Sequence, residues 1–271
     1  MLKQRILTAL ILLPIALCGF FLLKGAGFAL FIGVVVTLGA WEWARLAGLE
    51  AQAMRITFSA AVAALLFFLY LAPDLAPWVL GASVLWWMLA TYLVITYPAS
   101  SAHWSSVACK LLIGLLILLP AWQGLILIKQ WPLGNSLILT VMLLVWGADI
   151  GAYFSGKALG KRKLAPKVSP GKSWEGFYGG MLLCLAVTLG VGLYEGWAVG
   201  QIIQTLLGAA VVVAISVVGD LTESMFKRSA GIKDSSNLLP GHGGVLDRID
   251  SLTAAIPVFA VLLWAAGWGV L

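Results

Sequence analysis

The sequence predicts an all-α fold, a polytopic integral membrane helical bundle, and two observations carry this prediction. The chain of 271 residues is 62% hydrophobic and only 10% charged, and its mean hydropathy of +1.02 lies outside the range of soluble globular proteins. Its apolar runs are also long enough to cross about 30 Å of hydrocarbon, which takes roughly 20 helical residues. We therefore expect no separate soluble domain.

About nine apolar runs are candidates for transmembrane helices. Their boundaries are soft by several residues, because hydropathy locates the middle of a span better than its ends. The predicted spans are Ile6–Leu23, Gly27–Ala47, Ile56–Leu71, Pro77–Tyr97, Val107–Ile128, Ser136–Tyr153, Phe177–Leu193, Ile202–Val218 and Leu252–Val270.

The distribution of Lys and Arg predicts the orientation, because short loops rich in these residues stay in the cytoplasm. With a cytoplasmic N-terminus, 15 of the 17 basic residues, Lys3 and Arg5 among them, fall on the cytoplasmic side, and only Lys24 and Lys129 fall outside. A nine-span chain then ends on the outer side. Two polar stretches, Ser155–Trp174 and Asp220–Ser251, both lie on the cytoplasmic face, where they can build one site.

The second polar stretch carries acidic residues at both of its ends. A helix that continues out of the eighth span would place the following residues, spaced i, i+3, i+4 and i+7, on one stripe: Asp220, Glu223, Ser224 and Lys227. Asp247 and Asp250 repeat the spacing where the ninth span begins. Two helix ends that present carboxylates inward predict a pocket for a divalent cation with oxygen ligands.

Two further features of this stretch bear on its use. The run Pro240-Gly241-His242-Gly243-Gly244 predicts a turn whose glycines allow backbone N–H groups to approach an anion closely. The alternative to a site is a solvated loop in which the acids pair with Lys227, Arg228, Lys233 and Arg248. Because charge at membrane depth costs a few kcal/mol per residue, the position of the acids at span ends favours a functional site.

The first polar stretch predicts a flexible basic arm that leads into a helix. Gly171-Lys172-Ser173 resembles the end of a P-loop, but Pro166 stands where the first glycine of that motif belongs, so the motif is rejected. Ser173 is expected to cap the next helix, where free N–H groups favour a phosphate. Topogenic charge alone explains only part of the basic residues, and polyphosphate binding is the expected use of the rest.

Two acidic residues lie inside apolar spans. Asp149, near the cytoplasmic end of the sixth span, is expected either to bond between helices or to line the same cavity. Glu42 and Arg45, three residues apart near the end of the second span, are expected to form an interfacial ion pair. Carboxylates for a metal, basic groups for phosphates and no candidate nucleophile together indicate phosphoryl-type transfer, in which the protein positions and neutralises.

The C-terminal half resembles the phosphatidate cytidylyltransferase (CDP-diacylglycerol synthase) family. The resemblance rests on Ser224-Met225-Phe226-Lys227-Arg228, on Lys233-Asp234, and on the run from Leu239 to Asp250. Asp149, the Gly156–Lys163 arm and Ser169–Gly176 also match. The first five spans match in hydropathy only. We therefore divide the chain into N-terminal transmembrane helices, 1–135, and a C-terminal catalytic region, 136–271.

The resemblance implies a Mg²⁺-dependent reaction in which CTP and phosphatidic acid give CDP-diacylglycerol and pyrophosphate. It implies that Asp220 and Asp247 bind the metal, with Asp250 and Glu223 in support, and that a second cation can take part. Lys172, Lys227, Arg228 and Arg248 are expected to bind phosphates. His242 either donates a proton to pyrophosphate or bonds within the turn. Substrate contacts are further expected from Asp149, Ser224, Lys233, Gly243 and Gly244.

The same resemblance implies a multi-pass protein of a bacterial-type inner (cytoplasmic) membrane with its active site on the cytoplasmic side. Membrane lipid and a homodimer are expected partners, and nucleic acid is not. Two rival classes stay open. A CDP-alcohol phosphotransferase would need an Asp-Gly…Ala-Arg…Gly…Asp…Asp run, which this sequence lacks. A transporter would scatter its acids through paired, broken helices, whereas here they gather on one face.

Overall fold

The computed structural model describes residues 2–269, and of their side chains those of residue 8 and of residues 10–269. The elements in chain order are α1 (Leu2–Leu17), η1 (Cys18–Leu22), α2 (Gly25–Leu46), α3 (Gln52–Leu71), η2 (Pro73–Leu75), α4 (Ala76–Ile95), η3 (Ala99–Trp104), α5 (Val107–Gln130), α6 (Gly134–Leu159), β1 (Lys163–Ala165), β2 (Ser169–Ser173), α7 (Trp174–Tyr194), α8 (Val199–Ser229) and α9 (Leu246–Ala265). The predicted helical membrane fold is confirmed.

Within the described residues, eight helices are long and apolar enough to cross a membrane. They correspond to the second to ninth predicted spans. The first predicted span, Ile6–Leu23, is α1 followed by the π-helical segment η1, and its apolar part, Leu10–Leu22, is shorter than the other eight helices. The side chains of Lys3 and Arg5 lie outside the described part, so a ninth span and the orientation stay predictions.

Three helices extend well beyond their predicted spans. Helix α6 continues to Leu159, α8 continues to Ser229, and α9 already begins at Leu246. Hydropathy marks only the part of a helix that faces lipid, whereas these polar turns are stabilised by packing. Phe226, for example, is buried at the end of α8, with its ring 4.8 Å from that of Trp43 and 4.5 Å from that of Trp104. The acidic residues of the two predicted stripes therefore lie on helices rather than in the loop.

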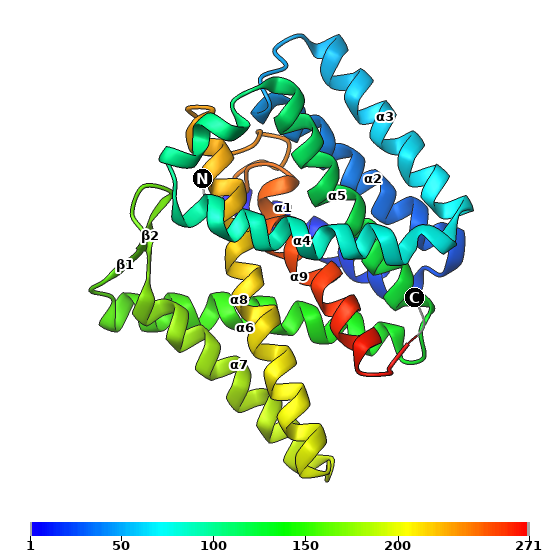
Figure 1. Ribbon diagram of the computed structural model, residues 1–271, viewed down its shortest axis with the longest axis vertical. Coiled ribbons are helices and arrows are strands. Elements are labelled where there is room, and N and C mark those ends of the chain that lie inside the picture. Colours follow the sequence, from blue (N-terminus) through cyan, green and yellow to red (C-terminus); the bar gives the residue numbers. More distant parts are fainter. Residues whose placement is uncertain (1, 270–271) are drawn as a thin grey trace.

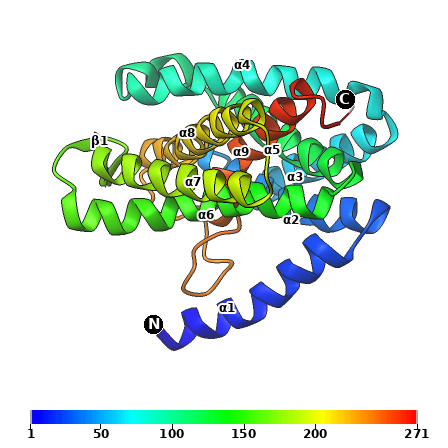
Figure 2. The ribbon, with the colours of Figure 1, turned by 90° about the horizontal axis from the view of Figure 1, so that it is seen from below.

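Helices α5 and α9 form the centre of the bundle, and more of their apolar length is buried than that of any other described span. Figure 1 shows α2, α3 and α5 on one side of α9 and the group α6, α7 and α8 on the other, with α4 crossing over both. In Figure 2, α1 lies apart from this body, and the loop between α8 and α9 extends towards it. Thr8 Oγ1 of α1 donates a hydrogen bond to the carbonyl oxygen of Pro240 in that loop, at 2.9 Å.

Helices α6 and α7 pack closely because glycines face each other across their contact. A Cβ on Gly151 would lie 2.8 Å from Gly180 Cα, and a Cβ on Gly180 would lie 2.4 Å from the carbonyl oxygen of Ala148. Neither neighbour can give way, since both atoms belong to backbone. The two glycines thus hold together α6 and α7, the helices that the strand pair β1–β2 joins.

We predict that Gly180→Ala destabilises the bundle by about 1–3 kcal/mol, the usual cost of overpacking a tight contact. The control is Gly190→Ala on the same helix, because nothing lies within 4 Å of a Cβ added there. Thermal unfolding in detergent micelles measures both variants. Equal midpoints for the two variants would contradict the close packing.

Candidate functional site

The site begins where α8 crosses α9, at a residue without a side chain. A Cβ on Gly219 would lie 2.8 Å from the carbonyl oxygen of Asp250 and 2.9 Å from Ala254 Cβ. Because Gly219 has no Cβ, the two helices approach closely just before Asp220. Asp220 and Asp250 consequently lie near enough for their charges to interact, so the acids of the two predicted stripes face one another.

A buried lysine joins the two helices about two turns further along α8. Lys227 Nζ lies 2.6 Å from Asp247 Oδ1 and 3.0 Å from Glu223 Oε1. The side chains of Lys227, Glu223 and Asp247 are 9%, 4% and 5% exposed, respectively. Charges at such depth persist only when they are paired, so this cluster requires all three partners.

A second lysine reaches Asp220 from the other polar stretch. Lys172 Nζ lies 2.6 Å from Asp220 Oδ2, and both side chains are about a quarter exposed. Ser224 Oγ donates to the other oxygen, Asp220 Oδ1, at 3.1 Å. The expectation that the two polar stretches build one site is thus met by a direct contact between them.

The basic arm differs from its prediction, because it forms a two-stranded antiparallel hairpin, β1 paired with β2. The base of the hairpin is fixed by Glu175, whose carboxylate accepts hydrogen bonds from the backbone N–H groups of Lys161 and Arg162. Its turn is fixed by Arg228, whose Nε donates to the carbonyl oxygen of Val168. Hydropathy and charge reveal neither contact, since both join residues distant in sequence. Ser173 caps α7 as expected, accepting from Gly176 N at 3.1 Å.

A cavity of about 380 Å³ opens beside the Lys172–Asp220 pair, between α6, α7, α8 and the hairpin. Asp149, Lys157 and Lys172 supply its charged groups, while Tyr153 and Phe177 supply aromatic walls. Asp149 also lies near enough to Lys172 and Asp220 for their charges to interact. Of the two expectations for Asp149, the structure supports the lining of this cavity.

The turn between α8 and α9 is built around the protein's own carboxylates. Asp247 Oδ2 accepts hydrogen bonds from Ser235 N at 2.9 Å, from Ser235 Oγ at 2.9 Å and from Gly244 N at 2.8 Å. Gly243 has a φ of +82°, which favours glycine. A Cβ on Gly244 would collide with Ser235 Oγ and with the carboxylate of Glu42. The predicted close approach of N–H groups to an anion therefore occurs, and the anion is Asp247.

The predicted ion pair between Glu42 and Arg45 is wrong. Glu42 is fully buried, and its four hydrogen-bond donors all belong to the segment from Ser235 to Leu246. Arg45 is exposed, and its guanidinium donates to the carbonyl oxygen of Ser235 at 3.5 Å. Sequence spacing suggested the local pair, because the true partners of Glu42 lie about 200 residues away.

The remaining predicted site residues are three exposed basic side chains and His242. Lys233 and Arg248 are exposed, and Arg228 is bonded to the hairpin and to the carbonyl oxygen of Ile232. His242 Nδ1 is buried and has no hydrogen-bond partner among the described residues. Nothing in the structure tests the substrate contacts predicted for these residues or for Ser224, Gly243 and Gly244, and they stay predictions.

The carboxylates of the site suit a divalent cation that is held partly by the protein and partly by substrate. In the part of the chain that the structure describes, no three His, Cys, Asp or Glu residues gather closely enough to enclose a metal ion. Mg²⁺ is usually held by one or two carboxylates together with waters and substrate phosphates, so two carboxylates suffice. Asp220 and Asp247 each have one oxygen against a lysine ammonium group, so each carboxylate faces a positive charge in this structure.

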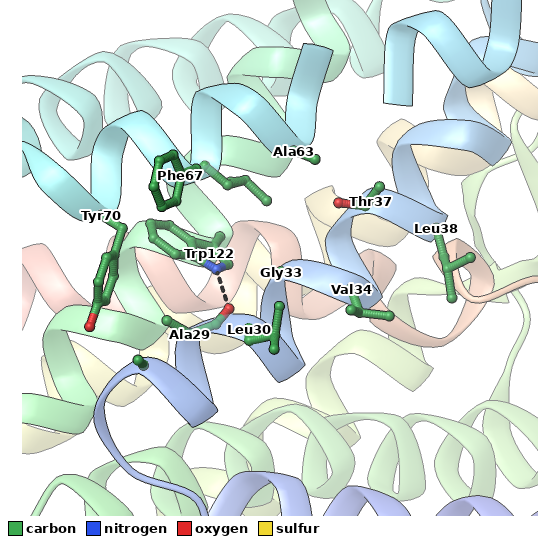
Figure 3. Close-up of a pocket in the computed structure, with 12 residues that line it drawn as sticks. Ala29, Leu30, Gly33, Val34, Thr37, Leu38, Ala63, Phe67, Tyr70 and Trp122 are labelled. Atoms are coloured by element: carbon green, nitrogen blue, oxygen red, sulfur yellow. Dashed lines mark hydrogen bonds between the residues drawn. The ribbon is translucent and has the colours of Figure 1, made fainter. Parts of the chain in front are cut away.

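A larger cavity, of about 520 Å³, lies between α2 and α3. Figure 3 shows its wall of Leu30, Val34, Phe67 and Tyr70, and Trp122, whose Nε1 donates to the carbonyl oxygen of Ala29 at 3.1 Å. None of its lining residues is Asp, Glu, His, Lys or Arg. Of these two cavities, the one beside Asp220 is the one that charged side chains line.

The helical membrane fold and the paired aspartates and lysines are those of a multi-pass membrane protein with a charged site. The chain belongs to the Cytidylyltransferase family, whose model matches residues 3–266. A phosphatidate cytidylyltransferase of Pseudomonas aeruginosa is 72% identical over 269 residues, which cover 99% of each chain. One of Haemophilus influenzae is 44% identical over 96% of this chain and 98% of its own. One of Staphylococcus aureus is 44% identical over 48% of this chain and 50% of its own.

We predict that Glu175→Ala loosens the hairpin, because it removes the carboxylate that holds Lys161 and Arg162. Trypsin should then cut at Lys161, Arg162 or Lys163 roughly three to ten times faster, as local opening becomes easier. Glu195→Ala, at the other end of α7, is the matched control. An unchanged cleavage rate in Glu175→Ala would show that Glu175 does not fix the hairpin.

Proposed function

We propose that this protein transfers the cytidylyl group of CTP to phosphatidic acid, giving CDP-diacylglycerol and pyrophosphate in phospholipid biosynthesis. The family and the two full-length relatives support this reaction. The observation that carries it in the structure is the pairing of Lys172 with Asp220 and of Lys227 with Asp247 at one helix crossing. These groups suit a reaction that brings two anions together, since lysine binds phosphates and carboxylates bind the cation that accompanies them.

The basic residues of the site form one functional group, and its carboxylates form the other. Lys172 and Lys227, with Arg228, Lys233 and Arg248 around them, bind and neutralise the phosphates of CTP and of the lipid. The cavity beside Asp149 receives the nucleotide, because it is the described cavity that combines charged groups with aromatic walls. A phosphatidate oxygen can attack the α-phosphorus directly, so the enzyme needs no covalent nucleophile and acts by positioning.

Mg²⁺ is the cofactor that this donor set fits, and Asp220 and Asp247 would hold it, with Asp250 and Glu223 close by. Four carboxylates face two lysine ammonium groups at this crossing, an excess of negative charge when all six groups are ionised. Mg²⁺ would offset that excess and the charge of the phosphates. We also propose that a second cation can bind at the same carboxylates.

A transporter, one of the two rival classes, fits the structure less well. A transporter is expected to place its charged groups at the interface of broken, repeated helices near the bilayer midplane. Here the acids and lysines gather where α8 ends and α9 begins. A single assay with detergent-purified protein separates the classes: formation of CDP-diacylglycerol from CTP and phosphatidate supports the proposal, and its absence in correctly folded protein overturns it.

We further propose that the protein lies in the bacterial inner membrane with this site on the cytoplasmic side, and that it forms a homodimer. The multi-pass fold and the bacterial relatives support the first statement. Lys24 and Lys129 lie near one another, and Lys129 bonds to Asn135 at the start of α6, whereas the hairpin follows the end of α6. The two lysines and the hairpin therefore lie at opposite ends of this span, which agrees with the predicted 15 to 2 distribution of basic residues. The homodimer rests on family resemblance alone.

We predict that Asp220→Asn lowers turnover by at least about 100-fold, because it removes charge that offsets a bound cation, a contribution of several kcal/mol. The matched control is Asp234→Asn, since Asp234 is exposed in the loop and belongs to neither cluster; it should stay within about threefold of the parent, like most surface changes. Activity is measured against Mg²⁺ concentration. Near-normal turnover with unchanged Mg²⁺ dependence in Asp220→Asn would reject the assignment.

We predict the orientation from the same distribution of charge. In a chain freed of Cys18, Cys109 and Cys184, a membrane-impermeant maleimide should label Lys24→Cys in intact spheroplasts. It should label Lys167→Cys, on the hairpin turn, only after permeabilisation. Labelling of Lys167→Cys in intact spheroplasts would place the site on the outer side.

A further inference from the structure

Glu42 stands out among the polar side chains that the reaction does not use. Its side chain is fully buried on α2, in the N-terminal half of the chain and outside the predicted catalytic region. An ionised carboxylate in such surroundings is stable only when donors satisfy its oxygens. Four donors do so, and every one of them belongs to the turn before α9 or to the first residues of that helix.

The two oxygens of Glu42 divide these donors evenly. Oε1 accepts from Ser236 Oγ at 2.5 Å and from Val245 N at 3.0 Å. Oε2 accepts from Ser235 Oγ at 3.1 Å and from Leu246 N at 2.7 Å. The first N–H groups of a helix have no partner within the helix, and Val245, the N-cap of α9, supplies no capping side chain. Glu42 therefore caps α9 from another helix.

One hydroxyl group links this cap to the proposed metal ligand. Ser235 Oγ lies 3.1 Å from Glu42 Oε2 and 2.9 Å from Asp247 Oδ2. A hydroxyl has a single proton to donate, so Ser235 shares it between the two carboxylates. Gly244 completes the link, because its N–H donates to Asp247 and its missing Cβ leaves room for Glu42 and Ser235.

We propose that Glu42 is a positioning residue for the reaction: it fixes the segment from Ser235 to Leu246 and, through Ser235, holds the carboxylate of Asp247 in place. The inference rests on the proposed function for its effect on turnover, but not for its effect on the turn. Residues that orient a metal ligand through hydrogen bonds typically change affinity or activity by about 10- to 100-fold when they are replaced. Glu42 itself touches no substrate.

The clamp is tested without catalysis by amide hydrogen exchange in the detergent-purified full chain. In Glu42→Gln one oxygen becomes an NH₂ group, which faces the backbone N–H of either Val245 or Leu246, a donor that cannot reverse its role. We expect exchange at Val245 and Leu246 to become at least about tenfold faster, since their protection requires the clamp. Parent-like exchange at both amides overturns the inference, whether or not the protein makes CDP-diacylglycerol.

The link to Asp247 is tested with two neighbouring serines. Ser235→Ala removes the hydroxyl that joins Glu42 to Asp247. Ser236→Ala removes a hydroxyl that contacts Glu42 and Leu238 N but not Asp247. Both side chains are buried, so the general structural cost of the two changes is matched. We expect kcat per folded molecule to fall about 10- to 100-fold in Ser235→Ala, with the KM for CTP little changed, and to change far less in Ser236→Ala.

A double-mutant cycle separates positioning from simple loss of structure. If Ser235 acts through Asp247, then Ser235→Ala should cause little further loss of kcat in an Asp247→Asn background, because the group that it positions has already been altered. Full additivity, or equal losses in Ser235→Ala and Ser236→Ala, contradicts the link. An inactive parent protein with fast exchange only in Glu42→Gln would instead overturn the proposed function and keep the clamp.

Discussion

The two lysine–aspartate pairs at the crossing of α8 and α9 are the interactions on which the rest of the site depends. Lys227 is nearly buried between Asp247 and Glu223, and charges at that depth are costly unless each has a partner. The Lys227–Asp247 pair therefore joins the last turns of α8 to the first turn of α9. The hairpin enters the same arrangement through Lys172, which reaches Asp220 from the other polar stretch.

Around these pairs the chain supplies close backbone approaches rather than bulky packing. Gly219 allows α9 to approach α8, Gly180 and Gly151 allow α7 to approach α6, and Gly244 leaves space for two oxygen-bearing side chains. Each glycine permits an approach that a Cβ would block, and Gly219 does so where α8 crosses α9. Lys227 of α8 reaches Asp247 of α9 across the same pair of helices, and in a low-dielectric surrounding a short distance strengthens the attraction between opposite charges.

Much of this site could be predicted from the sequence, because its main signals are local. The i, i+3, i+4, i+7 spacing places Asp220 and Lys227 on one stripe, and the structure shows both on α8. What the sequence could not predict depends on long-range contacts. The β1–β2 hairpin is fixed by Glu175 and Arg228, and Glu42 is bonded to a turn about 200 residues away. Hydropathy likewise could not show that α6, α8 and α9 continue past their apolar parts, because those turns are stabilised by packing.

The lysines now paired with Asp220 and Asp247 are proposed to occupy positions that a cation and the triphosphate take over during the reaction. The most direct test is an experimental structure with Mg²⁺ and a non-reactive CTP analogue. We expect the triphosphate in the cavity beside Asp149, with Lys172 Nζ on a phosphate oxygen and the metal ion at Asp220 and Asp247. A triphosphate bound elsewhere, with Lys172 still 2.6 Å from Asp220 Oδ2, would contradict this proposal.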